Sequence, residues 1–109
     1  MAIKTMKFDP AKYLKTEEDY AGYLADALET KNASFIADAI GVVAKARGMT
    51  QVSRKTGLGR ATLYKALSTE GNPGLNTLLA VFDALGLRLS VELPGRVKAR
   101  AKKPIKKAA

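Results

Sequence analysis

Helical spacing of apolar residues, interrupted by glycines, is the feature that most restricts the fold of this chain. Between residues 16 and 86 the apolar positions recur every three or four residues, as on one face of an α-helix. Glycines and one Gly-Asn-Pro-Gly cluster (residues 71–74) divide this region into short segments. The pattern predicts an all-α domain of five helices.

The expected helix ends follow from capping residues. Thr16 precedes three acidic residues and predicts a helix over about 17–30, and Asn32 predicts a second helix that ends at Gly48. Two short helices follow, one from Thr50 or its neighbour to Gly57 and one over about 59–67. Asn76 predicts the cap of a fifth helix, which ends at Gly86.

Residues 87–93 have a different period. Four apolar residues alternate strictly with Arg88, Ser90 and Glu92, which predicts a short C-terminal β-strand with one buried face. A single strand needs a second edge for its backbone groups. Three edges remain open: the segment 3–8 of the same chain, the same strand of a second subunit, or a strand of a different protein.

The net charge of +9 is unevenly distributed along the 109 residues. Residues 47–67 hold five basic residues and no acid, and residues 94–109 hold seven basic residues and no acid. We therefore divide the chain into an N-terminal extended segment (1–15), a folded domain (16–93) and a basic tail (94–109) that we expect to be disordered or loosely helical. A strongly basic chain favours an anionic partner, with nucleic acid as the first candidate.

The composition excludes several classes of protein. The chain has no His and no Cys, so the usual general bases, nucleophiles and transition-metal ligands are missing. We expect no enzymatic activity, no metal and no other cofactor. The N-terminus lacks the apolar core of a secretory signal, and the longest aliphatic or aromatic run is Leu78 to Phe82, too short to cross a membrane. We expect a soluble, cytoplasmic protein with no membrane partner.

Residues 49–68 have the spacing of a DNA-binding helix-turn-helix. Ser53 is small where two helices would cross, and Gly57 follows four residues later as the turn glycine. The positions that would lock the second helix onto the first are apolar: Val52, Leu58, Leu63 and Ala66. The sequence therefore predicts that the second short helix reads double-stranded DNA.

The candidate DNA-binding residues lie on the outer face of this motif. Arg60 is suited to a bidentate hydrogen bond with guanine, and Thr62 and Tyr64 to a phosphate or a thymine methyl group. The alternative is a solvated basic face, but the absence of acids over 21 residues favours DNA, and Tyr64 either covers the edge of the core or contacts DNA. The full predicted set is Thr50, Gln51, Arg54, Gly59, Arg60, Ala61, Thr62, Tyr64 and Lys65.

Several motifs resemble the probable addiction-module antidote family, HigA-like antitoxins with a Cro and lambda-repressor type helix-turn-helix. The resemblance covers about residues 8–93 and is most specific over residues 56–73. Gly59 departs from the wider repressor group, in which Ser is the more usual cap of the reading helix. The motifs that carry the resemblance are Phe8-Asp9, Tyr13-Leu14, Glu17-Glu18, Tyr23-Leu24, Ala27-Leu28, residues 47–52, residues 56–58, residues 63–68 and Gly71-Asn72-Pro73.

The resemblance implies a five-helix, lambda-repressor-like fold and a type II antitoxin. Such a protein would neutralise a RelE/ParE-type toxin, bind its own operator as a homodimer and repress its operon. Two alternatives remain: a stand-alone repressor, and a basic nucleoid-associated protein that binds DNA without regard to sequence.

We expect the toxin-binding surface on residues 8–32 together with the strand 87–93. Its candidate side chains form a stripe on the first helix that alternatively only covers the core of the domain itself: Tyr20, Tyr23, Leu24 and Leu28.

Overall fold

The computed structural model of the chain describes residues 10–94, which form five α-helices and one short 3₁₀ helix. The 3₁₀ helix, η1, spans Pro10–Tyr13, within the segment that the sequence predicts to be extended. The α-helices are α1 (Glu17–Glu29), α2 (Ala33–Arg47), α3 (Met49–Thr56), α4 (Arg60–Ala66) and α5 (Leu75–Ala84). The predicted all-α class and the number of helices are confirmed.

The caps of α1 and α2 are the predicted ones. The Asp19 N–H donates to Thr16 Oγ1 at 3.1 Å and the Asp19 carboxylate accepts from the Thr16 N–H at 3.0 Å, which completes a capping box. The Phe35 N–H donates to Asn32 Oδ1 at 3.0 Å at the start of α2. Each side chain thus satisfies a backbone donor that the first helical turn leaves without a partner.

The predicted cap of α5 is wrong. The helix begins at Leu75 with Gly74 as its N-cap, so Asn76 lies inside the first turn. Gly74 has the extended backbone that an N-cap requires, with φ −73° and ψ 169°, and follows a proline that cannot donate a hydrogen bond. The N-cap of α5 therefore lies two residues earlier in the chain than the sequence pattern predicts.

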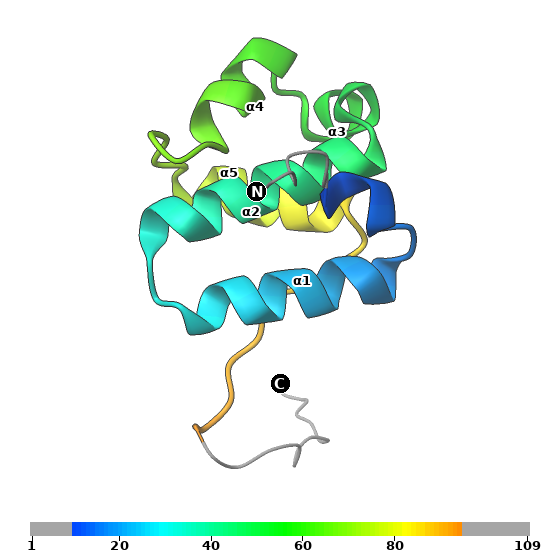
Figure 1. Cartoon of the computed structure of the whole chain (residues 1–109). Coiled ribbons are helices and arrows are strands. Elements are labelled where there is room, and N and C mark those ends of the chain that lie inside the picture. The colour runs from blue at the N-terminus through cyan, green and yellow to red at the C-terminus, as the bar shows by residue number, and fades with distance from the viewer. Residues whose placement is uncertain (1–9, 95–109) are drawn as a thin grey trace, which may run out of the picture.

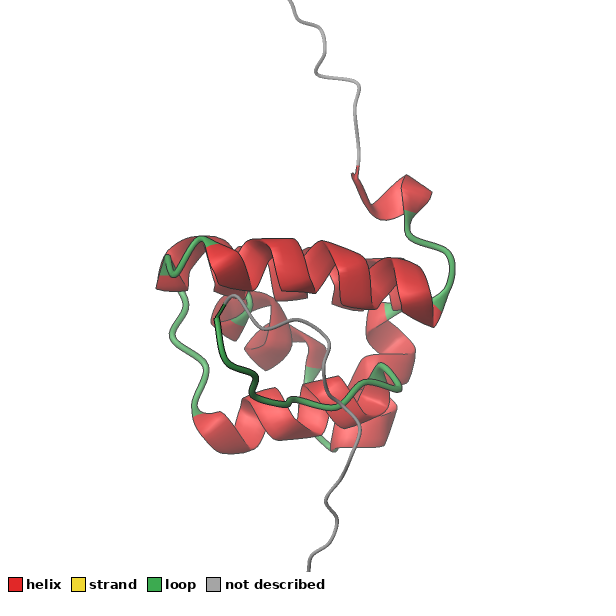
Figure 2. Ribbon diagram, turned by 90° about the horizontal axis from the view of Figure 1, so that it is seen from below, coloured by secondary structure: helices red, strands yellow, loops and turns green. Residues whose placement is uncertain are grey.

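The described residues contain no β-strand, so the strand expected over 87–93 is not formed in the single chain. The Leu87 N–H donates to the Phe82 carbonyl oxygen at 2.8 Å, and the segment then runs as a loop across the helices (Figure 2). A strand needs a second edge, and the candidate edge at residues 3–8 lies outside the described residues.

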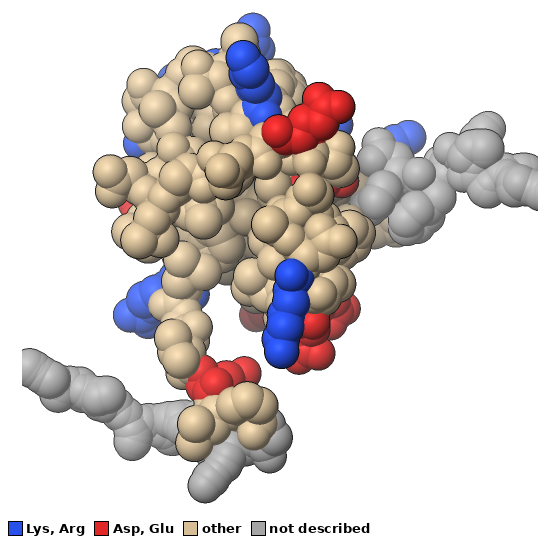
Figure 3. Space-filling model, turned by 90° about the vertical axis from the view of Figure 1, so that its left-hand side faces the viewer, with Lys and Arg blue, Asp and Glu red and all other residues tan. Residues whose placement is uncertain are grey.

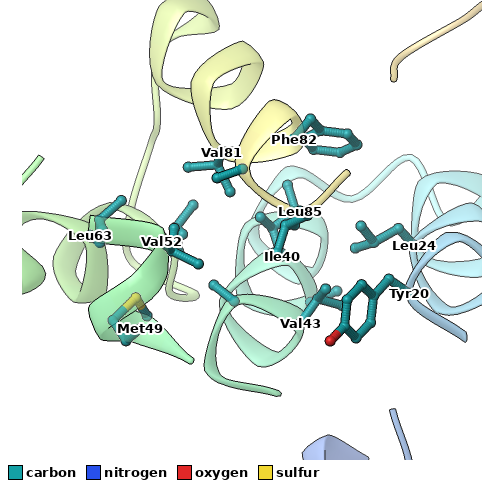
Figure 4. Close-up of a cluster of buried hydrophobic side chains, with 14 of the residues drawn as sticks. Tyr20, Leu24, Ile40, Val43, Met49, Val52, Leu63, Val81, Phe82 and Leu85 are labelled. Carbon is teal, nitrogen blue, oxygen red and sulfur yellow. The ribbon is translucent and has the colours of Figure 1, made fainter. Parts of the chain in front are cut away.

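The five α-helices share one hydrophobic core, which connects the two ends of the molecule. Figure 1 shows α3 and α4 at one end, α1 at the opposite end, and α2 and α5 between them. Ile40 and Val43 of α2 are 2% and 0% exposed and contact both sides: Tyr20 and Leu24 come from α1, and Val52 from α3 (Figure 4). Because α1 contributes three fully packed side chains, it is part of the domain core.

Candidate nucleic-acid interface

The turn between α3 and α4 is fixed by side chains of α3. The Ser53 hydroxyl donates to the Leu58 carbonyl oxygen at 2.6 Å, and the Leu58 N–H donates to Thr56 Oγ1 at 3.1 Å. Gly57 ends α3 with φ 79° and ψ 6°, a left-handed conformation that costs a glycine little. The direction in which α4 leaves α3 is therefore set by local hydrogen bonds.

The inner face of α4 is anchored in the core. Leu63 of α4 and Val52 of α3 are both 0% exposed, as the spacing predicts. Leu67, the C-cap of α4, is 4% exposed and also packs in the core. Leu58 and Ala66, the other two predicted packing positions, are partly buried. At the end of α4 the backbone of α2 comes so close that a Cβ at Gly41 would collide with the Leu67 carbonyl oxygen. The packing leaves only one face of α4 free.

The outer surface formed by α3 and α4 together carries every residue predicted to contact DNA. Tyr64 is 49% exposed, so its ring is accessible at the outer surface. Gly59 caps α4 with extended backbone and no side-chain hydrogen bond. All nine predicted residues are exposed: Thr50, Gln51, Arg54, Gly59, Arg60, Ala61, Thr62, Tyr64 and Lys65.

One hydrogen bond links the two helices on this face. The Arg60 guanidinium donates through Nη1 to Thr50 Oγ1 at 3.2 Å, so the first turn of α4 lies beside the first turn of α3. Arg has five N–H donors, and this bond uses one of them. The guanidinium is thus oriented and keeps donors for an external acceptor. Spacing along the sequence does not predict this bond.

The charged side chains of the α3–α4 segment are all basic. Residues 47–67 hold five basic residues and no acid, and none of Arg54, Arg60 and Lys65 forms an ion pair within residues 10–94. On the side of the molecule in Figure 3 most residues are uncharged; Lys or Arg side chains project at the upper end, where Figure 1 places α4, and acidic side-chain atoms lie beside one of them. An exposed cationic face without internal partners is suited to a polyanion.

The four residues of α1 that the sequence predicts for toxin binding differ in how deeply they are buried. Tyr20 and Leu24 are 4% and 2% exposed and pack in the core, so they offer almost no surface to a partner. The alternative that the stripe covers the domain's own core holds for these two residues. Tyr23 is partly buried and Leu28 is 45% exposed. Burial, reinforced by the nearby Asp38 carboxylate, raises the pKa of the Tyr23 hydroxyl.

A groove that the sequence did not predict runs between α1 and residues 87–94. Ala25 and Leu28 of α1 form one wall and Leu89 and Leu93 the other, with Phe82 of α5 also contributing. Its only signal in the sequence is the alternation over 87–93. The helix α1, which forms one wall of the groove, lies at the opposite end of the molecule from α4 (Figure 1).

No feature of the described residues fits a metal site or a membrane span. Residues 10–94 contain no cluster of three acidic residues placed to hold a metal ion. Over the same residues no helix combines the length and hydrophobicity that crossing a bilayer requires.

The comparisons with known proteins bear on the whole folded domain. The model of a family described as "Probable addiction module antidote protein" matches residues 4–93. The chain belongs to this family. An uncharacterized protein of Haemophilus influenzae is 42% identical over 92 residues, which cover 84% of this chain and 95% of that protein. No solved structure matches the chain. The resemblance inferred from the sequence motifs is confirmed, and membership of an antidote family implies an antitoxin role and a toxin partner.

Proposed function

We propose that this antidote protein is a sequence-specific DNA-binding antitoxin in which α3, the turn at Gly57 and α4 form a helix-turn-helix of the lambda-repressor type. The single observation that carries the proposal is the outer face of α4. Its inner side is anchored by Leu63 at 0% exposure, while Arg60 and Lys65 are exposed beside Thr50. A short helix held rigidly in this way is suited to enter the major groove of DNA.

The proposed complex is a homodimer on operator DNA. Two copies of α4 would meet successive major grooves roughly 34 Å apart, as in other dimeric helix-turn-helix proteins. Arg60 would read guanine through a bidentate hydrogen bond, and Lys65 and Thr50 would hold the phosphate backbone. Binding of its own operator would repress the operon from which antitoxin and toxin are expressed in the cytoplasm.

The second proposed activity is neutralisation of a RelE/ParE-type toxin through the α1 side of the domain. This side is separated from α4 by α2 and α5, so both partners can bind at once (Figure 1). Residues 1–46 carry six lysines against seven acids, and this balance does not repel a basic toxin as the α3–α4 face would. Family membership favours this function over a stand-alone repressor.

Co-purification tests the proposal. The chain is co-expressed with the product of the neighbouring gene, and the complex is mixed with DNA from upstream of the gene pair. We expect a stable complex that shifts this DNA at concentrations that leave scrambled DNA free. Absence of a toxin complex would favour the stand-alone repressor. Equal binding to both DNAs, with a steep dependence on salt, would favour a nucleoid-associated protein.

A further inference from the structure

The segment 87–93 has backbone groups that form no hydrogen bond within the described residues, and several of its apolar side chains are exposed. Within the described residues, no hydrogen bond engages the backbone of residues 88–94. Val91 is 96% exposed and Leu93 is 65% exposed. Unpaired backbone groups beside exposed apolar side chains are a template for strand pairing.

The sequence of this segment is complementary to itself in the antiparallel direction. An antiparallel pair of identical segments centred on Ser90 sets Arg88 opposite Glu92 of the second copy, and Glu92 opposite Arg88 of the second copy. Leu89 then faces Val91, and Leu87 faces Leu93, on the other side of the ribbon. The two charge pairs and all four apolar pairs form in this single register. A shift by one residue would set charged residues opposite apolar ones.

We propose that residues 87–93 of two copies of this chain pair as antiparallel β-strands centred on Ser90 and thereby form the homodimer. The pairing supplies the second edge that the single chain lacks. The interface is isologous, because each residue contacts its counterpart through the same two-fold axis. It specifies the homodimer of the proposed function, but it depends on neither DNA nor toxin.

The surroundings of the segment support a ribbon at this place. A two-stranded ribbon is marginal by itself in water and needs packing on one face. Leu87, Leu89 and Leu93 line the groove, as do the polar residues Arg88, Ser90 and Glu92, and the other wall includes Ala25 and Leu28 of α1. The groove therefore provides an apolar surface under the ribbon. Because it lies on the α1 side, pairing leaves α4 of both copies uncovered.

Cross-linking tests the register. The chain contains no Cys, so Ser90→Cys introduces a unique thiol. Opposite residues of an antiparallel pair have Cβ atoms about 4.5–5.5 Å apart, close to the separation in a disulfide. We expect most of the S90C protein to form a disulfide-linked dimer under mild oxidation. The matched control, Thr69→Cys in the exposed loop after α4, should stay mostly monomeric on a denaturing gel. Equal cross-linking of both variants would overturn the proposed register.

Charge exchange tests the pairing itself by sedimentation velocity at low salt. Glu92→Arg and Arg88→Glu each create two like-charge pairs and should weaken dimerisation roughly tenfold. An equimolar mixture of the two variants should restore dimers, since every pair across the interface is then of opposite charge. The double variant R88E/E92R should also dimerise. Restoration by mixing excludes an effect within one chain.

Three results would overturn the proposal. The first is a wild-type chain that is monomeric at tens of micromolar, and the second is a dimer whose stability neither charge reversal changes. The third is a charge-reversed variant that stays dimeric but no longer binds the toxin, which would make the groove a toxin-binding site. Circular dichroism serves as the control that each variant is folded. The side chains of Arg88 and Glu92 are both exposed, so their substitution should not disturb the core. A dimer that forms as proposed but binds no operator would contradict the proposed function and leave this inference intact.

Discussion

Arg60 shows how a single side chain joins fold and function in this protein. Its guanidinium is oriented by Thr50, on a helix that buried leucines hold in place. The sequence predicted the exposure of Arg60 because helical spacing sets which face of α4 is apolar. The bond to Thr50 was not predictable, because it depends on the angle between α3 and α4, which only the packed structure defines.

Gly41 is the residue at which packing tolerates least change. A methyl group there would meet the Leu67 main chain, which belongs to the backbone and cannot rotate away. Gly41→Ala should lower the free energy of unfolding by about 1–3 kcal/mol. Urea denaturation measures the change. The control is Gly22→Ala, at an exposed position of α1 where a Cβ would meet nothing within 4 Å. A stable G41A protein would mean that α4 packs less closely on α2.

At the scale of elements, local sequence signals predicted helix starts where a side chain supplies the cap. Thr16 and Asn32 accept backbone hydrogen bonds as expected. The start of α5 was not predictable from Asn76, since Gly74 caps by backbone conformation alone. The strand over 87–93 was not formed because its stability depends on a second edge, which a periodic pattern cannot supply.

The capping box of α1 makes helix stability depend on pH. Hydrogen bonds from the Lys15 and Thr16 backbone N–H groups lower the pKa of Asp19 below its ordinary value of 3.8. A lowered pKa in the folded state stabilises the protein above pH 3.8, and this contribution is lost as the pH falls through the lowered pKa. Thermal melts of wild type and Asp19→Asn should therefore differ at pH 6 and converge in acid. A difference that is independent of pH would contradict this role.

The α1 helix also separates the two proposed surfaces. Leu28→Arg should abolish rescue of growth from the toxin, because Leu28 is exposed on the side away from α4. Leu28 also lines the groove beside residues 87–93, so operator binding is compared at concentrations at which sedimentation shows that the variant is dimeric, and it should then match the wild type. Arg60→Ala should have the opposite effect. Removal of α1 is not a suitable test, because Tyr20 and Leu24 belong to the core and the truncated domain would lose its packing. Rescue by L28R would place the toxin surface elsewhere.

At the scale of the whole molecule, the chain combines a folded cationic face with a basic C-terminal region that lies mostly outside the described residues. The sequence predicted both concentrations of charge, since charge counts need no structure. It did not predict which faces lie on opposite ends, because that depends on how α2 and α5 separate α1 from α4 (Figure 1).

The basic tail should contribute affinity without selectivity. Deletion of residues 97–109 removes six of the chain's basic residues and should weaken binding to all DNA by a similar factor. The slope of log K against log salt should fall by about 0.9 for each phosphate that the shortened chain no longer neutralises. Titrations of operator and scrambled DNA at several salt concentrations measure both quantities. Loss of operator preference after the deletion would show that the tail reads bases.

Competitive gel shifts show whether the outer face of α4 reads DNA. Arg60→Ala and Lys65→Ala are compared with Lys31→Asn, which also removes one positive charge but lies between α1 and α2, where Asn tolerates the positive φ of 56°. Arg60→Ala should cost about 1–3 kcal/mol on the operator and relax selectivity at one base pair. Lys65→Ala should weaken operator and scrambled DNA alike, and Lys31→Asn should change neither beyond a small effect of charge. Unchanged operator affinity in the R60A/K65A double variant would show that a surface other than the outer face of α4 reads the operator.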